Sequence, residues 1–374
     1  MESYKHPVSE EGEFVGREKE IDEIKNNFLK ETKDYYHYVI SGMGNYGKTS
    51  FMRYLYFTLF GKDEKFIQKF DTALIEFNSF MEEFKQKSDF KETFNEQIKP
   101  LIKADAKEKI LLIDDYDKML NKFPDDFINS ISSLDEKRIF LILAGQKDIS
   151  LLEREYANRF PLYTRYTHSI TLGGMDDSIY TLKKDNDNKS INSIQLIDFL
   201  RSKIGLKTDC LNDDVKSEIV TYSSGIPYFI KRILYELLSE WLDNYAMHPL
   251  KIDDVENAVS KIIEPSKEYT IKRACWFDEE PYGTINVVPN SVVLIRDIVN
   301  AIAAVGKGKA RRGEIMKKVI PLPYPNREIE RARIASFNEK LNKLATMGFV
   351  AQDNEYLVGI PHMFFYKGEN IIYD

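Results

Sequence analysis

The stretch Gly42-Met43-Gly44-Asn45-Tyr46-Gly47-Lys48-Thr49 fits the pattern G-x-x-x-x-G-K-[ST]. It is preceded by the apolar residues 38–40 and followed, from Ser50 on, by apolar residues at mostly helical spacing. A strand, a glycine-rich turn and the start of a helix are the context that this pattern needs to bind phosphate. The glycines let backbone N–H groups curl around phosphate oxygens, and the helix N-terminus adds a favourable field. The stretch therefore predicts a phosphate-binding loop.

The residues of this loop have distinct expected roles in binding ATP or ADP. Lys48 should reach the β- and γ-phosphates and assist catalysis, and the Thr49 hydroxyl should ligate Mg²⁺. The predicted nucleotide-binding residues of the loop are Gly42, Gly44, Asn45, Tyr46, Gly47, Lys48, Thr49 and Ser50.

A second part of the site is predicted further along the chain. Residues 109–115 form an apolar strand that ends in Asp114 and Asp115. A central parallel strand delivers such side chains to the crevice where ligands bind. Asp114 should hold Mg²⁺ through water, because Mg²⁺ dehydrates reluctantly. Asp115 should orient or deprotonate the attacking water. Asp115 is one methylene shorter than the Glu of vigorous hydrolases, so we expect slow turnover. The alternative is a strand followed by a solvated acidic turn.

Bulk properties narrow the class of protein. The 374 residues indicate two or three domains. Cys210 and Cys275 are far apart and give neither a disulfide framework nor a metal pattern. The start of the chain lacks the order of a signal peptide, and no apolar run approaches the roughly 20 residues of a membrane span. We therefore expect a cytoplasmic protein that does not enter a membrane.

The order of strand and helix patterns predicts an α/β fold. Strands are expected over 37–41, 72–77, 109–114, 138–144 and 168–172. Helical stretches separate most of them, which favours a parallel sheet covered on both faces. From about residue 176 the pattern becomes helical, with helices expected over 192–204, 211–222 and 227–243. We predict a nucleotide-binding domain over 1–175 and a helical lid domain over 176–264.

The last part of the chain has a different organisation. Residues 265–290 are irregular and contain three prolines, so we expect a linker or insertion there. Residues 291–374 are expected to form helices over 291–305, 313–319 and 327–347, a basic turn over 307–312 and a hairpin around 353–354. Three helices followed by a hairpin are the outline of a winged-helix domain.

Taken in order, these motifs resemble the AAA+/STAND superfamily of ATPases, and its small archaeal-type members above all. The resemblance rests on residues 14–18 (Phe-Val-Gly-Arg-Glu), the phosphate-binding loop, the aspartate strand, residues 225–227 (Gly-Ile-Pro) and the winged-helix outline. It spans roughly residues 12–367, and only the loop and the aspartate strand are individually specific. The Gly-Ile-Pro form is closer to the STAND pattern than to that of AAA+ initiators.

The resemblance implies roles for further residues. Phe14, Val15 and Arg17 would line the adenine pocket, and Gln146 would sense the γ-phosphate. Arg165 would reach the nucleotide of a neighbouring subunit in a nucleotide-dependent homo-oligomer. Gly225 and Pro227 would bring the helical domain against the nucleotide. The alternative for residues 14–17 is a solvated loop, and the alternative for Gln146 is a turn residue at the end of a strand. Arg165 has the alternative of a surface arginine. The alternative for Gly225 and Pro227 is a turn followed by a proline that begins a helix.

The charge distribution leaves two main functions open. The chain has a net charge of −7, yet residues 291–374 carry 13 Lys and Arg against 9 Asp and Glu. This asymmetry favours a DNA-acting ATPase whose winged helix grips duplex DNA. The expected DNA contacts are Arg311, Arg312, Arg331, Arg333, Lys340 and Lys343. The alternative is a STAND-type signalling or defence ATPase, whose winged helix is an internal nucleotide sensor and whose partner is a protein. A third interpretation is a protein that holds ADP only as a structural ligand.

Overall fold

The computed structural model describes a defined part of the chain. Its described residues are 14–31, 36–42, 46–103, 107–135, 139–146, 167–172, 191–203, 210–223, 225–243, 249–262, 293–306, 309–321, 326–346, 350–353 and 356–359. The chain divides into two compact units, one within His6–Leu172 and the other within Gly173–Asp374. Each unit is described by itself.

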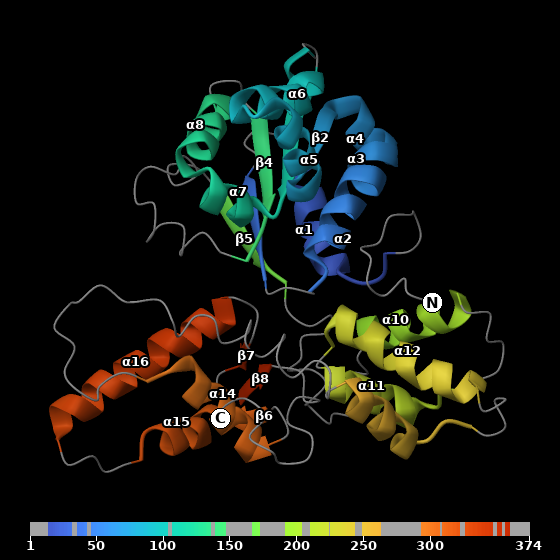
Figure 1. The fold of residues 1–374 in the computed structure, drawn as a ribbon, viewed down its shortest axis with the longest axis vertical. Helices are drawn as coiled ribbons and strands as arrows, with labels where there is room; N and C mark the ends of the chain where they lie inside the picture. The colour runs from blue at the N-terminus through green and yellow to red at the C-terminus, as the bar shows by residue number, and fades with distance from the viewer. Residues whose placement is uncertain are drawn as a thin grey trace. The chain divides into compact units, whose positions relative to one another are not determined.

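The first unit is built on a parallel five-stranded sheet (Figure 1). Its strands are β1 (His37–Ser41), β2 (Phe70–Glu76), β3 (Glu108–Asp114), β4 (Ile139–Ala144) and β5 (Thr167–Thr171), in the order β2-β3-β4-β1-β5. The predicted α/β fold with a parallel sheet is thereby confirmed, and each predicted strand lies within two residues of the observed one. In the register of the sheet, Ala144 lies opposite both Ile40 and Asp114. The carboxyl ends of β1, β3 and β4 therefore meet at one edge.

Helices cover both faces of this sheet. They are α1 (Glu18–Phe28), α2 (Lys48–Tyr54), the π-helical segment η2 (Leu55–Leu59), α3 (Phe60–Lys62), α4 (Glu64–Lys69), α5 (Phe77–Lys87), α6 (Phe90–Lys103), α7 (Tyr116–Lys122) and α8 (Pro124–Asp135). Leu111 and Ile113 of β3 face a core shared with α5 to α8. On the other face Phe28 of α1 contacts the rings of Tyr38, Phe70 and Phe140. A parallel sheet needs this cover, because its strands are apolar on both sides.

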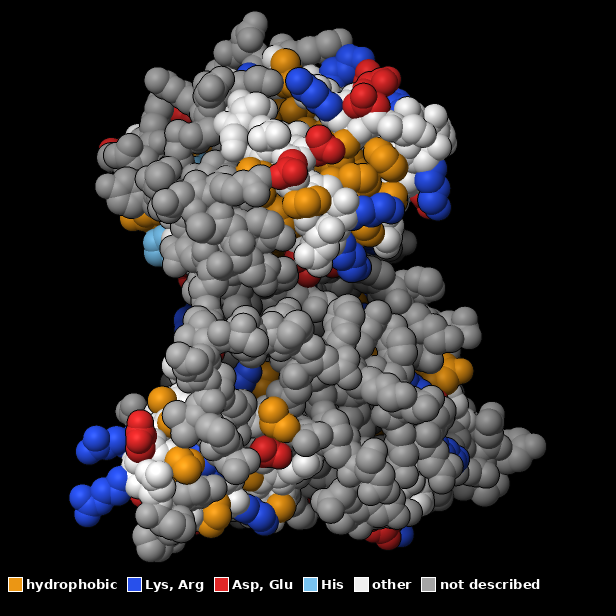
Figure 2. Space-filling view, turned by 60° about the vertical axis from the view of Figure 1, so that its left-hand side comes forward, with side chains coloured by type: hydrophobic (Ala, Val, Ile, Leu, Met, Phe, Trp, Pro, Cys, Tyr) orange, Lys and Arg blue, Asp and Glu red, His pale blue; other side chains and the backbone are white. Residues whose placement is uncertain are grey.

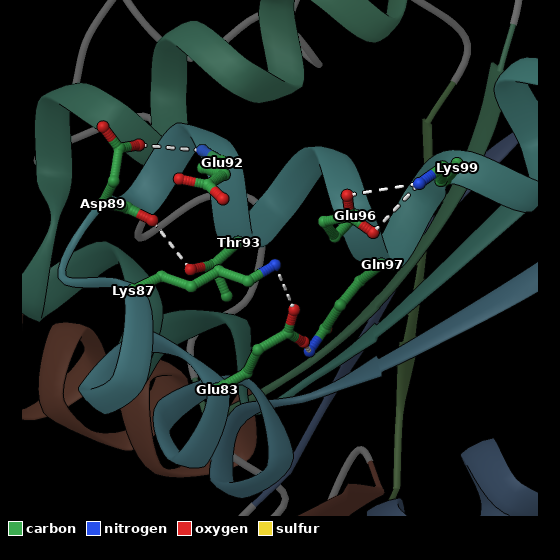
Figure 3. Close-up of polar contacts among 8 residues, drawn as sticks. All are labelled: Glu83, Lys87, Asp89, Glu92, Thr93, Glu96, Gln97 and Lys99. Atoms are coloured by element: carbon green, nitrogen blue, oxygen red, sulfur yellow. Dashed lines mark hydrogen bonds and ion pairs between the residues drawn. The ribbon is translucent and has the colours of Figure 1, made fainter.

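The corner between α5 and α6 shows how local polar contacts fix the layer of helices (Figure 3). The Asp89 carboxylate accepts from the backbone N–H of Glu92 at 2.8 Å, and its carbonyl accepts from the Thr93 hydroxyl at 2.7 Å. An Asp that accepts from the third residue of a helix is a typical N-cap. Across the corner, Glu83 accepts from Gln97 of α6 at 3.0 Å and pairs with Lys87 at 2.8 Å. These contacts hold α6 against α5.

The second unit begins with a group of helices. They are α10 (Ile191–Lys203), α11 (Asp213–Ser223), α12 (Pro227–Asp243) and a further helix over 252–262. The first three agree with the sequence prediction, and the helix over 252–262 was not predicted. Gly225 follows the end of α11 with a φ of 68°, and its N–H donates to the Val220 carbonyl. The local backbone therefore explains both residues, because glycine is favoured just after the end of a helix and proline at the first position of the next helix.

The last described elements form a small α/β module. They are α14 (Ile295–Gly306), β6 (Lys309–Arg311), α15 (Arg312–Val319), α16 (Arg327–Thr346), β7 (Val350–Asp353) and β8 (Tyr356–Gly359). The three strands pair antiparallel in the order β6-β8-β7. The predicted helices and hairpin are present, but part of the expected basic turn is the strand β6. No helix in the described part of the chain is long and apolar enough to span a membrane.

Candidate nucleotide-binding site

The phosphate-binding loop connects β1 to α2, as the sequence predicts. Its described glycines, Gly42 and Gly47, have φ angles of 152° and 86°, which favour a residue without a side chain. A Cβ atom on Gly42 would lie 2.6 Å from the carbonyl oxygen of Leu172, which follows β5. The loop is therefore pressed against the end of β5. The predicted contacts Gly44 and Asn45 lie outside the described residues.

Lys48 begins α2 and is almost fully buried, with 7% of its surface exposed. Its Nζ donates to the Gly42 carbonyl oxygen at 2.7 Å, across the base of the loop. Burial lowers the pKa of Lys48, and the charges of Asp117, Asp114 and Asp115 oppose that shift. The fold thus places the ammonium group of Lys48 among three carboxylates at the carboxyl edge of the sheet.

Asp114 and Thr49 meet beside this lysine. Asp114 ends β3 and is 3% exposed, and the Thr49 hydroxyl donates a hydrogen bond to its carboxylate. Burial raises the pKa of Asp114 to about 6. Its Oδ1 is buried and has no hydrogen-bond partner among the described residues. A buried carboxylate oxygen without a partner, next to a hydroxyl, fits a hard cation such as Mg²⁺, which prefers oxygen ligands.

Asp115 differs from Asp114 in its surroundings. It occupies the N-cap position of α7 without a side-chain capping bond, and its φ of 54° is a left-handed conformation that Asp tolerates better than most residues. Its Oδ2 forms an ion pair with Nζ of Lys118 at 2.6 Å, and about a quarter of its side chain is exposed. Asp115 is thus more accessible than Asp114, but activation of water by its carboxylate would compete with Lys118.

The residues expected at the adenine pocket lie against the loop and α2. The Phe14 ring stacks on Tyr54 with centroids 4.7 Å apart. Arg17 is buried, has a φ of 68°, and its Nη2 donates to the Tyr46 carbonyl oxygen at 3.4 Å. Val15, which lies between Phe14 and Arg17 in the sequence, is partly buried. Tyr46 is itself buried, so its ring packs into the protein and its backbone is held by Arg17.

Gln146 follows the end of β4 and has a partner that the sequence analysis missed. Its backbone N–H donates to the carboxylate of Asp117, in the first turn of α7. Asp117 is 7% exposed, and burial raises its pKa. A third carboxylate after the Asp114-Asp115 pair resembles a solvated acidic turn in sequence. The repeated Asp at the start of a helix was the only signal that could have drawn attention to it.

Arg53 and Glu76 form a second contact that was not predicted. Nε and Nη2 of Arg53 donate to the two carboxylate oxygens of Glu76 at 2.6 and 3.1 Å. Glu76 ends β2 and lies opposite Asp114 in the register of the sheet. The pair therefore joins α2 to the strand next to the predicted metal ligand. No local spacing reveals it, because the two residues meet only through the fold.

The described structure does not test the roles of the remaining predicted residues. Ser50 lies in the first turn of α2 and is partly exposed. Gly225 and Pro227 belong to the other unit, where they connect α11 to α12. Arg165 lies outside the described residues.

These observations define the nucleotide-binding fold. A glycine-rich loop links β1 to α2 in a five-stranded parallel sheet, and an aspartate ends β3, which is separated from β1 by β4 alone. The fold is that of a P-loop nucleotide-binding domain. No protein-family model matches the chain, and no curated protein matches it significantly.

Several solved structures resemble the chain at low identity. Cdc6p from Pyrobaculum aerophilum is 16% identical, with 100% of this chain and 97% of that chain covered and a TM-score of 0.45. The Aeropyrum pernix ORC1 protein, solved in complex with DNA, is 12% identical, with 93% and 90% covered and a TM-score of 0.48. The ORC2 protein of the same organism, solved as ADPNP–ADP complexes, is 12% identical, with 97% and 96% covered and a TM-score of 0.49. Likeness at this level assigns no residue and no partner.

The basic residues expected to contact DNA differ in their exposure. Lys340 was expected to be exposed to DNA, and this is wrong, because only 5% of its surface is exposed. It lies three residues after Phe337 and four before Leu344, so it shares their buried face. Arg333 is partly buried and donates to the Val319 carbonyl at 3.2 Å.

Other basic residues of the module reach the surface. Nη2 of Arg312 donates to Asn338 at 2.7 Å, which joins the start of α15 to α16. Arg311 and Arg331 are exposed, and the Lys343 side chain lies outside the described part. Exposed basic residues that the sequence analysis did not select are Lys317, Lys318 and Arg327. Figure 2 shows Lys and Arg side chains protruding from this unit at the lower left, with acidic side chains close by.

Proposed function

We propose that the chain is an ATP-binding, slowly hydrolysing molecular switch that couples its nucleotide state to DNA binding through a C-terminal winged helix. One observation carries the nucleotide part. Lys48, Thr49 and Asp114 come from two separate elements and meet at the carboxyl edge of the sheet, beside the glycine loop. Such a set is costly to bury, and it fits the phosphates and magnesium ion of ATP.

The chemistry that these residues would perform follows from their positions. Lys48 would neutralise charge on the β- and γ-phosphates, and Thr49 with Asp114 would hold Mg²⁺. When bound, the metal would stabilise the negative charge that develops on the transferred phosphoryl group. Asp115 would orient the attacking water, and its ion pair with Lys118 supports the expectation of slow turnover. Gln146 would contact the γ-phosphate from the end of β4.

The DNA part of the proposal rests on the basic excess of residues 291–374 and on the exposed side chains of α15 and α16. Because Lys340 is buried, the proposed phosphate contacts are Arg311, Lys317, Lys318, Arg327 and Arg331. We interpret the module as a winged helix, with α14, α15 and α16 as its helices and β7 and β8 as the hairpin. Phosphate contacts of this kind give affinity with little sequence preference.

A second function is favoured by a different observation. Two of the basic residues of the module, Arg312 and Arg333, are engaged in contacts between α15 and α16. The first turn of α16 carries Glu328 and Glu330. A module whose basic residues serve its own packing suits a STAND-type signalling ATPase that responds to nucleotide and acts on a protein partner. DNA binding by the whole chain separates the two functions.

The test of the nucleotide site uses Lys48→Ala. Loss of the ammonium should weaken ATP binding by at least about a hundredfold, because a buried site then lacks its charge-assisted hydrogen bond to phosphate. The measurement is titration calorimetry of the full chain with ATP and Mg²⁺. The exposed Lys65→Ala, which removes the same charge from α4, is the control and should bind as the wild type does. Equal affinity of wild type and Lys48→Ala would refute the assignment.

A further inference from the structure

Asp117 is a buried carboxylate to which the proposed reaction assigns no role. It lies in the first turn of α7, three residues after Asp114, and 7% of its surface is exposed. Its carboxylate accepts from the backbone N–H of Gln146. Its Oδ1 is buried and has no hydrogen-bond partner among the described residues. A carboxylate in this setting costs free energy, so its retention calls for a reason.

The segment that Asp117 contacts fits against it without spare room. A Cβ atom on Gly145 would lie 2.7 Å from Oδ1 of Asp117 and 2.7 Å from Cε1 of Tyr116. Real Cβ atoms do not approach other atoms so closely, so an alanine here would force the side chain of Asp117 or Tyr116 to move. The Gly145 N–H donates to the Ile40 carbonyl at 3.0 Å, which extends the contact of β4 with β1. The chain is thus held on both sides just before Gln146.

Asp117 also interacts electrostatically with the lysine of the phosphate-binding loop. Among the nearby carboxylates, Asp117 contributes more than Asp114 or Asp115 to keeping Lys48 charged. The acid that holds Gln146 is therefore electrostatically close to the group expected to bind the γ-phosphate. This links the end of β4 to the start of α2 through one side chain.

We propose that Asp117 is a positioning residue that sets the place of Gln146 relative to Lys48 and the γ-phosphate, so that the site distinguishes ATP from ADP. The inference rests on the proposed function, because it concerns the same site. A fixed second layer behind a contacting group is what keeps such a group within the narrow range that catalysis requires. Oδ1 points at Gly145, so Asp117 acts through Gln146 and does not itself activate water.

The experiment is a double-mutant cycle between Asp117 and Gln146 in the full chain. Asp117→Ala should lower the turnover number for ATP by about 10- to 100-fold, the usual cost of removing a supporting hydrogen bond, and change ADP affinity by less than about threefold. The double variant Asp117→Ala with Gln146→Ala should be no slower than Gln146→Ala alone. Asp117→Asn, which keeps an oxygen to accept from Gln146, should recover most of the turnover. Asp126→Ala, an exposed acid on α8, is the control.

A second variant guards against loss of folding. Gly145→Ala leaves Asp117 intact but forces it away from the strand end, and it should give the same loss of turnover, again without additivity to Gln146→Ala. Independent, additive effects of both variants, or an equal loss of ADP affinity, would show a merely structural residue and overturn the inference. A wild-type chain without ATP turnover would overturn the proposed function itself, and this is seen before any variant is made.

Discussion

At the scale of single residues, the site gathers charges that burial makes costly. Asp114, Asp117 and Lys48 are each more than nine-tenths buried. Burial raises the pKa of the two aspartates and lowers the pKa of the lysine, and both changes favour the neutral form of the group. Natural proteins keep such groups where function requires them, and function and stability then oppose each other. The same carboxylate that fits Mg²⁺ should therefore destabilise the chain without a ligand.

Asp114→Asn should make the nucleotide-free chain more stable at neutral pH. The folded pKa of Asp114 is about 6, above the ordinary value of about 3.9, so the folded state holds the proton more tightly than the unfolded chain. The penalty is present above pH 6 and is relieved as the pH falls towards 4. Removing the charge should add roughly 1–3 kcal/mol to the free energy of unfolding at pH 7.5. Denaturant melts at pH 7.5 and pH 4 would measure it.

The prediction for Asp114→Asn has a control variant and a result that would contradict it. Asp126→Asn, on the surface of α8, should change the free energy of unfolding by less than about 0.5 kcal/mol at either pH. The gain from Asp114→Asn should largely disappear at pH 4, and Mg²⁺-dependent ATP binding should be abolished. A variant that is less stable than the wild type at pH 7.5 would show that the charged form is already compensated in the fold.

The sequence predicts the residues of local motifs and misses those that pair across the fold. Lys48, Thr49 and Asp114 were found because their motifs are short and have a defined context. Arg53 with Glu76, and Asp117 with Gln146, join elements far apart in the chain, and no periodicity marks them. Lys340 was misplaced because the buried face of α16 is wider than its apolar stripe. Gly44, Asn45 and Arg165 lie outside the described residues and remain predictions.

At the scale of elements, the first unit was predicted well because strand and helix patterns alternate. The departure lies just after α2, where residues 55–59 form a π-helical turn. Such turns insert a residue into a helix and rotate the side chains that follow. Leu55 and Leu59 are buried, whereas Phe57, between them in the sequence, is 50% exposed. The strand β6 and the helix over 252–262 were also missed, the strand because it is only three residues long and basic.

The π-helical turn predicts that two apolar side chains only two residues apart, Leu55 and Phe57, contribute very differently to the stability of the fold. Leu55→Ala should cost about 2–5 kcal/mol in the free energy of unfolding, because it leaves a cavity in a closed core. Phe57→Ala should cost less than about 1 kcal/mol, although it removes the larger side chain, because half of it is already in water. Urea melts of the two variants against the wild type decide the matter. Comparable losses would mean that Phe57 packs inside a regular helix.

At the scale of the whole molecule, the two units divide the proposed work. The sheet unit contains the described residues of the phosphate-binding loop, and the other unit contains Gly225, Pro227 and the C-terminal module. Nucleotide can control the second unit only by binding one arrangement of the units better than another. The partner is the point on which the two proposed functions differ, so it is tested on the intact chain in defined nucleotide states.

Duplex DNA should bind the intact chain through the exposed basic side chains of α15 and α16, with micromolar strength at moderate salt, roughly the range expected when phosphate contacts dominate. Replacing Lys317, Lys318 and Arg331 with Ala should weaken binding and reduce the slope of log affinity against log salt by about 0.9 for each phosphate that is no longer neutralised. A matched triple variant of the sheet unit, Lys19, Lys65 and Lys91 to Ala, removes the same charge from exposed sites and should keep the wild-type slope. Fluorescence anisotropy over a salt series, with ADP and with a non-hydrolysable ATP analogue, measures both. If the wild type does not bind DNA at low salt with ADP and does not bind it with the ATP analogue, the charged surface of the module serves a protein partner. The signalling function then replaces the DNA-acting one.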